Sequence, residues 1–452
     1  MTPGSVEASA RASGRFGVAF GPRFFLLLTA GLMWLPPAFV EPRFAYAIAV
    51  WDGLVGFLWL FDLLGLPSPG CFTVRRTWAA PPALSVASQV SLMLVNESRA
   101  SVRAVLLDAV PHQLRAAPPS MQMSVGPGGQ AGADYQILPS ERGTATVGDA
   151  YIRYRSTMGV AERWARVAIS QTMVVYPNLD QASSESMRLV RGRQVDVERR
   201  ARRMRGRGRS FVSLRDFREG DEFRDMCWTA SARRGKLVTR EYDTERSQSI
   251  WIVIDAGRLM RARIAQLTKL DHAVNAALTL SRVALASGDR VGLLTYGTRI
   301  GYRLPLSRGN VHLRQIIDRL ALVRAEESEA DHVQAAGRLL TDQKRRSLVV
   351  WITDLPDTAM TPEVVEAASR VMSRHLVILV VIGHPELYRV AERLPETAME
   401  MYETAAAQEV TGRRNLLLAR LRTQGALVTE TQSNLSMTLA NAYLDVKQRN
   451  RL

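Results

Sequence analysis

Residues 249–255 read Ser-Ile-Trp-Ile-Val-Ile-Asp, and residues 348–354 read Leu-Val-Val-Trp-Ile-Thr-Asp. Each stretch is apolar almost throughout and ends in an aspartate, and helical patterns follow both. Near-continuous apolar strands that alternate with helices are typical of a parallel sheet covered on both faces. Residues 249–452 are therefore predicted to form a doubly wound α/β domain. Ligands of such sheets bind at the carboxyl ends of the strands, where Asp255 and Asp354 lie.

Two apolar segments near the N-terminus predict a transmembrane hairpin. Phe24–Val40 carries no charge, and Phe44–Leu66 is apolar apart from Asp52 and Asp62. A membrane-spanning helix needs about 20 such residues, so residues 24–66 have room for two spans. A cleaved signal peptide is the alternative, which the second segment and the absence of a clear cleavage site disfavour. We interpret Asp52 as carried by the apolar span, with a helix-pairing role as the alternative.

Arginines flank this hairpin on both sides. They are Arg11, Arg15 and Arg23 before it, and Arg75 and Arg76 after it. The connection between the two segments has one arginine and one glutamate. By the positive-inside rule, residues 1–23 are predicted to be a cytoplasmic tail, and all downstream domains are predicted to be cytoplasmic too. The chain is thus expected to be a multi-pass protein of a bacterial inner membrane.

A β-rich region and a basic linker follow the hairpin. Alternating side chains in residues 86–94 and 151–155, separated by turn residues such as Gly126-Pro127-Gly128-Gly129, predict a β-sandwich over residues 72–180. In the linker, residues 183–209, the stretch Arg188–Arg209 holds ten arginines against only Asp196 and Glu198, and its net charge of +8 is half of the chain's +16.

The basic linker has three interpretations. The first is a solvated charge run, and the second is an attachment to anionic lipid or to an acidic partner. Nucleic acid is the third, because arginine neutralises phosphate, but the linker lacks the interleaved aromatic residues on which bases stack.

Residues 210–248 carry a dense, mixed-charge motif. Its members are Gly220, Asp221, Arg224, Trp228, Arg233, Arg240, Glu241 and Glu245. The motif resembles the signature of a bacterial domain-of-unknown-function family, and the resemblance extends through residues 138–143, 175–178, 270–272 and 288–292. Members of that family join two transmembrane helices, a β-sandwich, the signature and a von Willebrand factor A-like domain. They are commonly encoded beside a MoxR-type AAA+ ATPase.

The signature residues have two interpretations. The charged side chains can form an ion network that holds the segment to the α/β domain, with Trp228 anchoring it by burial. Alternatively, the same charges form a ligand or partner site.

The von Willebrand resemblance implies a metal-ion-dependent adhesion site. Its pattern is Asp-x-Ser-x-Ser after the first strand, a threonine from a later loop and an aspartate after the fourth strand. Asp255 and Asp354 are present, but Gly257 and Leu259 stand at the serine positions and Ala330 near the threonine position. Hydroxyl and carboxylate oxygens suit Mg²⁺, so we expect either weakly bound Mg²⁺ at the two aspartates or no cofactor.

We predict that the carboxyl edge of the sheet binds a protein partner. The residues expected there are Asp255, Gly257, Arg258 and Asp354, with Arg258 compensating the two carboxylates. The resemblance implies that the partner is a MoxR-type AAA+ ATPase, acting in chaperone-like assembly or metal insertion. The alternative is a membrane-tethered binder of nucleic acid or anionic lipid that uses the arginine-rich linker.

The sequence gives no support to an enzyme. Gly235-Lys236-Leu237 lacks the spacing and hydroxyl of a phosphate-binding loop, and two cysteines exclude a disulfide scaffold. Cys227 is interpreted as a buried thiol beside Trp228 rather than a nucleophile. His272 lies on a periodic helix and is expected to be packed rather than catalytic.

The charge pattern around the hairpin predicts the membrane topology. A reporter fused after Leu452 is expected to behave as cytoplasmic, because arginines flank the hairpin at both ends. Paired phosphatase and fluorescent-protein fusions measure this, and phosphatase activity in the periplasm would contradict it.

Overall fold

The computed structural model of the chain divides into two compact units, Met1–Tyr176 and Pro177–Leu452. The described residues are 7–13, 17–178, 210–218, 223–243, 247–355, 362–431 and 435–449. Each unit contains its own hydrophobic core. The basic linker of residues 183–209 lies outside the described residues.

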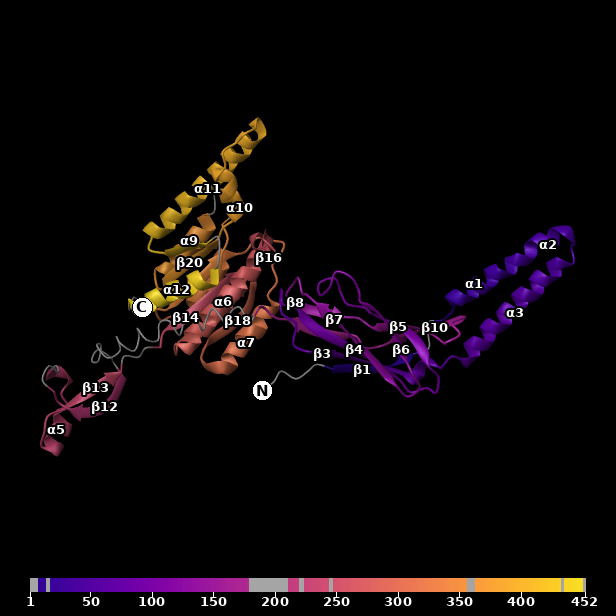
Figure 1. Ribbon diagram of the computed structural model, residues 1–452. Helices are drawn as coiled ribbons and strands as arrows, with labels where there is room; N and C mark the ends of the chain where they lie inside the picture. Colours follow the sequence, from indigo (N-terminus) through magenta and orange to yellow (C-terminus); the bar gives the residue numbers. More distant parts are fainter. Residues whose placement is uncertain are drawn as a thin grey trace. The chain divides into compact units, whose positions relative to one another are not determined.

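The first unit contains two helices that are long and apolar enough to cross a membrane, Pro22–Val40 and Phe44–Gly65. They comprise α1 (Pro22–Ala30), the 3-10 turn η1 (Gly31–Trp34), α2 (Leu35–Val40) and α3 (Phe44–Gly65) (Figure 1). The predicted pair of apolar helices is confirmed. The reversal falls at residues 41–43, and Pro36-Pro37 lies in the first turn of α2, where proline is tolerated.

The two apolar helices approach each other closely at Gly31. A Cβ atom on this glycine would lie 2.6 Å from Cδ1 of Trp51 and 3.4 Å from a carboxylate oxygen of Asp52. The indole Nε1 of Trp51 donates a hydrogen bond to the carbonyl oxygen of Leu27 at 2.9 Å. Asp52 therefore faces the neighbouring helix, which favours the helix-pairing interpretation of this residue.

An antiparallel β-sandwich makes up the rest of the first unit, as predicted. Its strands are β1 (Glu7–Ser13), β2 (Val18–Phe20), β3 (Phe72–Trp78), β4 (Ser88–Asn96), β5 (Val102–Asp108), β6 (Ser120–Val125), β7 (Gln130–Ile137), β8 (Gly143–Val147), β9 (Ala150–Arg155), β10 (Ala161–Val167) and β11 (Gln171–Val175). The larger sheet has the order β6-β5-β9-β10-β1-β3-β4-β7, with β2 beside β10, and β11 pairs with β8.

The predicted tail is wrong for residues 7–13, which form strand β1 of this sandwich. β1 pairs with β3 between Glu7↔Thr77 and Arg11↔Thr73, and it also pairs with β10. The chain thus leaves the sheet, runs through both apolar helices and returns to the same sheet. If these helices cross a membrane, the pairing of β1 with β3 requires an even number of crossings, because both strands lie on the same side.

One of the flanking arginines lies in the sandwich core. The Arg76 side chain is fully buried, and its Nε donates to Asp108 at 3.0 Å. Its Nη1 and Nη2 donate to the carbonyl oxygens of Ile169 and Gly148 respectively, each at 2.9 Å. Asp108 also accepts a hydrogen bond from the Tyr135 hydroxyl at 2.7 Å. Arg76 therefore stabilises the fold and adds no positive charge to the domain surface.

Asp62, near the end of α3, joins this helix to the sandwich. Its Oδ2 accepts hydrogen bonds from the backbone N–H groups of Val160 at 3.0 Å and Ala161 at 2.8 Å, and its Oδ1 accepts one from the Ser156 hydroxyl. Arg163 in β10 donates to the carbonyl oxygen of Leu63 at 3.2 Å. These bonds fix the end of the helix to the turn between β9 and β10.

The second unit contains the predicted α/β domain. Its strands are β14 (Ser249–Asp255), β17 (Arg290–Tyr296), β18 (Ile300–Ser307), β19 (Leu348–Thr353), β20 (Leu376–Ile382) and β21 (Leu427–Thr431). Its main helices are α6 (Lys269–Ala286), α7 (Gly309–Leu322), α8 (His332–Asp342), α9 (Pro362–Met372), α10 (Pro385–Glu392), α11 (Ala398–Thr423) and α12 (Leu435–Gln448). Short elements near the first strand are η4 (Arg258–Arg261), β15 (Arg263–Ile264) and β16 (Leu267–Thr268).

The sheet of this domain has the order β18-β17-β14-β19-β20-β21, in which β18 alone is antiparallel to its neighbour. The polypeptide starts in the middle and winds outward in both directions, which is the doubly wound arrangement. Side chains of β14 alternate between two cores: Ile252 packs with α6, α7 and α12, and Val253 packs with α8, α9 and α11. The predicted fold class is confirmed.

The signature segment forms a small module of its own. β12 (Ser210–Asp216) and β13 (Val238–Asp243) pair antiparallel, and η3 (Phe223–Asp225) and α5 (Trp228–Arg234) lie between them in sequence (Figure 1). The Ser231 hydroxyl accepts a hydrogen bond from the backbone N–H of Val238 at 2.9 Å, which holds α5 to β13.

The contacts of Asp62 predict its contribution to stability. Asp62→Ala removes the acceptor of two buried N–H groups and is expected to lower the free energy of unfolding of the sandwich by about 1–3 kcal/mol. Denaturant unfolding of the full chain in detergent measures this. Asp134→Ala is the control, because Asp134 is exposed and bonds only to exposed Gln89 at 2.8 Å, so a change within about 0.5 kcal/mol is expected. Equal losses in both variants would contradict the assignment.

Candidate functional site

The fold brings Asp255 and Asp354 together at one edge of the sheet. β14 and β19 are adjacent and parallel, with Ile254 opposite Ile352, so both strands end at the carboxyl edge. The side chains are nearly inaccessible, with 3% of Asp255 and 4% of Asp354 exposed. The predicted pair of carboxylates therefore exists, but it lies beneath the surface.

Asp255 is held by groups of its own loop and of the neighbouring strand. Its Oδ1 accepts a hydrogen bond from the backbone N–H of Gly257 at 2.7 Å, and its Oδ2 accepts one from the Thr353 hydroxyl at 2.6 Å. Burial disfavours the charged form and raises the pKa of Asp255 to about 6, although both hydrogen bonds oppose this shift.

Asp354 is neutralised by two buried cations. Lys269 Nζ forms an ion pair with its Oδ2, and Arg414 Nη2 donates to its Oδ1 at 3.1 Å. The Lys269 side chain is fully buried and that of Arg414 is 5% exposed. The backbone N–H of Leu355 adds a further bond to Oδ1 at 2.8 Å. Each carboxylate oxygen of Asp354 thus has a partner within the protein.

The prediction that Arg258 compensates the aspartates is wrong. Arg258 lies at the rim, 58% exposed, and pairs with Glu329 at 2.9 Å. Beside it, Arg261 pairs with Glu327 at 3.0 Å. Lys269 and Arg414 supply the compensating charge instead, from sequence positions 85 and 60 residues away from Asp354.

The positions aligned with the adhesion motif lie together but present no hydroxyl oxygen. A Cβ atom on Gly257 would lie 2.8 Å from Ala330 and 3.1 Å from Asp255 Oδ1, so the loop that carries Ala330 does reach the site. Among the described residues, no group of three or more His, Cys, Asp or Glu side chains is arranged to hold a metal ion. A divalent cation does not fit this donor set, because both carboxylates are already bonded and two cations occupy the space around Asp354.

A buried hydrogen-bonded group that the sequence did not indicate lies in the same domain. The Tyr296 hydroxyl accepts a hydrogen bond from Trp351 Nε1 at 2.6 Å and lies 2.9 Å from His332 Nδ1. Burial raises the pKa of Tyr296 well above its usual value and lowers the pKa of His332. Both groups are therefore neutral near pH 7, as suits a structural network.

Arg414, which lies on α11, connects the aspartate site to β21 and α10. Its Nε donates to Glu430 in β21 at 3.1 Å, and Glu430 accepts a further bond from the Tyr388 hydroxyl at 2.6 Å. The chain Lys269–Asp354–Arg414–Glu430–Tyr388 thus links α6, the end of β19, α11, β21 and α10. Sequence reasoning missed Lys269 and Arg414. Lys269 has one local signal, since a cation in the first turn of a helix opposes the helix dipole.

Comparison with known proteins agrees with the resemblance seen in the sequence. Residues 213–415 match the family described as protein of unknown function DUF58. This part of the chain belongs to that family. The α/β domain has the von Willebrand factor A-like fold expected for it, with the strand order given above.

Relatives with curated sequences match part of the chain, and two of them are described as uncharacterized proteins. The uncharacterized protein YeaD of Bacillus subtilis (strain 168) is 22% identical over 195 residues, which cover 43% of this chain and 46% of YeaD. The uncharacterized protein Rv1480 of Mycobacterium tuberculosis is 25% identical over 184 residues, covering 40% of this chain and 56% of Rv1480. The chain therefore spans about half the length of these relatives. Among solved structures, the SpRpn10 VWA domain is 14% identical with a TM-score of 0.28, covering 43% of this chain and 95% of that domain.

The DUF58 signature residues are only partly described. Gly220, Asp221 and Glu245 lie outside the described residues, as do the side chains of Arg224, Arg240 and Glu241. The predicted burial of Trp228 is wrong: the indole is 66% exposed and begins α5 on the surface of its module. Arg233 is exposed as well, and Cys227 is half-buried.

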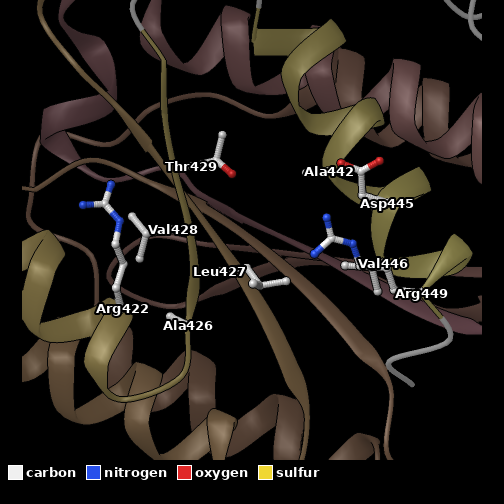
Figure 2. Close-up of a pocket in the computed structure, with 9 residues that line it drawn as sticks. All are labelled: Arg422, Ala426, Leu427, Val428, Thr429, Ala442, Asp445, Val446 and Arg449. Carbon is white, nitrogen blue, oxygen red and sulfur yellow. The ribbon is translucent and has the colours of Figure 1, made fainter.

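His272 and a cavity beside β21 lie apart from the aspartate pair. His272 is half-buried on α6, with Nε2 3.4 Å from the carbonyl oxygen of Ile264. A cavity of about 370 Å³ runs along the start of β21 (Figure 2). Its lining includes Arg422, Leu427 and Arg449. Because this cavity adjoins the amino end of its strand, it does not open onto the aspartates at the carboxyl edge.

The raised pKa of Asp255 predicts a pH dependence of stability. Between about pH 4 and pH 6 the folded state binds a proton that the unfolded state has released, so stability falls as the pH rises through this window. In Asp255→Asn the amide oxygen can still accept from the Gly257 N–H, and the amide N–H can donate to the Thr353 hydroxyl, so the variant is expected to abolish this fall and to be about 1–3 kcal/mol more stable than the wild type at pH 7. Denaturant unfolding from pH 4 to pH 7.5 measures both curves. Parallel curves would contradict the prediction.

Proposed function

We propose that this chain is a membrane-anchored protein-interaction module, whose α/β domain binds a protein partner at the carboxyl edge of its sheet. One observation carries the proposal: the centre of that edge is closed and internally neutralised, whereas its rim is charged and exposed. Asp255 and Asp354 are buried, while Arg258 and Glu329 are 58% and 75% exposed. Such an edge offers a surface for a macromolecule and leaves the aspartates without access to a small substrate.

The helices α10 and α11 with the connection between them, which we call the arm, provide a second reason to propose a protein partner. Figure 1 shows these helices reaching beyond the sheet. Four large apolar side chains lie exposed in the connection between these helices and in the first turns of α11: Leu394 at 87%, Met399 at 69%, Met401 at 62% and Tyr402 at 76%. Exposed apolar groups clustered in this way are typical of protein interaction sites.

The family resemblance supplies the identity of the proposed partner, a MoxR-type AAA+ ATPase in chaperone-like assembly or metal insertion. In this proposal the two apolar helices anchor the chain in a bacterial inner membrane, and the exposed arginines that flank them favour a cytoplasmic location of the domains. In this proposal, the buried residues Asp255 and Asp354, with Gly257, hold the loops of the carboxyl edge in position. Arg258 makes the direct contact.

Partner capture from native membranes tests the proposal. Crosslinking and affinity purification of the full chain are expected to recover an AAA+ ATPase without nucleic acid. Arg258→Glu is expected to reduce that recovery about fivefold, because rim charges steer and orient association. Arg370→Glu is the matched control, since Arg370 also forms an exposed pair, with Glu366 at 2.6 Å on α9.

Other outcomes distinguish the alternatives. Equal recovery of the ATPase with Arg258→Glu and with the control would remove the partner from this edge. Salt-sensitive binding to DNA or anionic vesicles that disappears when residues 199–209 are deleted would favour the linker-based function instead.

A further inference from the structure

We infer that Lys269 is the resident cation of the aspartate centre, and that its ammonium group takes the place of the divalent metal ion expected in a von Willebrand factor A-like domain. This inference goes beyond the proposed function, because it holds for the isolated protein whatever partner binds. It rests on the burial of Lys269, on the way its helix is fixed, and on the balance of charges around Asp354.

The burial of Lys269 is complete. Lysine is almost never fully buried unless it is paired, because removing an ammonium ion from water is costly. Here 0% of the side chain is exposed, and Nζ contacts Asp354 Oδ2. A surface lysine with a chance contact would keep its ammonium group in water, so this contact is a built feature of the domain.

The first turn of α6 is fixed at the position that delivers this ammonium group. Thr268 and Asp271 form a capping box, in which each side chain accepts a hydrogen bond from the other residue's backbone N–H. The backbone N–H of Lys269 donates to the carbonyl oxygen of Ala262 at 2.8 Å, which ties the helix start to the loop that follows β14. The helix dipole disfavours a cation here, and Asp354 offsets this cost.

The charges around Asp354 balance without any ion. Lys269 and Arg414 are the cations, and Asp354 and Glu430 are the anions that they contact. Asp255, beside this group, is held by neutral donors, and burial favours its protonated form. A divalent ion at Asp354 would meet two buried positive groups, so its binding requires that at least one of them leave.

Gly257 and Ala330 fit the same picture. In a metal site these positions carry hydroxyl ligands, but here Gly257 has no side chain and Ala330 has only a methyl group. A Cβ atom placed on Gly257 would lie 2.8 Å from the Ala330 Cβ, so the two positions are close together. The loss of neutral oxygen ligands and the gain of a buried ammonium group thus occur around one pair of aspartates. Ligand recognition at this edge is accordingly independent of metal.

Metal titration of the full chain in detergent tests the inference. Wild-type protein is expected to show no stoichiometric Mn²⁺ binding by calorimetry, and no change in melting temperature with EDTA or with millimolar Mg²⁺ or Mn²⁺. Lys269→Ala opens space beside Asp354 and is expected to lower the melting temperature by at least about 5 °C, and millimolar Mn²⁺ is expected to restore part of that loss. Lys269→Met removes the charge but fills the space, so a similar loss without rescue is expected.

Lys447→Ala is the matched control. Lys447 Nζ lies 2.8 Å from Asp289, whose carboxylate is also fully buried, so its loss is expected to destabilise the protein without rescue by Mn²⁺. Stoichiometric Mn²⁺ binding by the wild type, abolished by Asp255→Asn, would overturn the inference. So would a Lys269→Ala variant that is as stable as the wild type, or one that is destabilised and gains nothing from Mn²⁺. Should Lys269→Ala fail to fold, the wild-type titration still decides between the two views.

Discussion

The buried contact between Lys269 and Asp354 is the interaction on which the arrangement of the α/β domain depends. An aspartate at the end of a central strand cannot remain charged beneath the surface without a partner, because desolvation penalises it strongly. Lys269 brings the start of α6 to this position, and Arg414 brings the middle of α11 to the other side. Through Glu430 and Tyr388 the same set of contacts reaches β21 and α10. Elements from both halves of the domain thus meet at one carboxylate.

The first unit, Met1–Tyr176, also uses a buried aspartate to join two of its parts. Asp62 interrupts an apolar helix, and in sequence it is only a charged residue in a predicted span. In the structure its two oxygens receive hydrogen bonds from the turn between β9 and β10, so the helix is joined to the sandwich by buried polar contacts. Because β1 precedes the hairpin and pairs with β3 after it, the sandwich also holds both ends of the hairpin. Buried polar groups therefore fix the two apolar helices to the sandwich.

Local pattern predicted the elements well and their long-range contacts poorly. The runs around Ile252 and Val350 are apolar because both faces of the sheet are covered, so the strands, their order of appearance and the aspartates at their ends were predictable. The burial of Lys269 was not predictable, because a charged residue at the start of a helix is usually solvated. Its partner Asp354 is also 85 residues away. Arg258 was assigned to the aspartates because it is near in sequence, whereas the turn of η4 carries it to the rim. Burial of Trp228 was inferred from composition alone, which says nothing of the direction in which the indole points.

Because Asp255 and Asp354 are buried, a partner at the carboxyl edge of the sheet could gain little binding free energy from them. The exposed pairs of Arg258 with Glu329 and of Arg261 with Glu327 are screened by salt, and pairs of this kind contribute about 0–1 kcal/mol each. With Asp354 satisfied internally, a partner carboxylate has no metal to bind and meets no uncompensated cation at the centre. Most of the binding free energy must then come from the burial of apolar surface. The side chains of Leu394, Met399 and Tyr402 on the arm are exposed and of the right kind. Charge at the rim would orient the partner, and the arm would hold it.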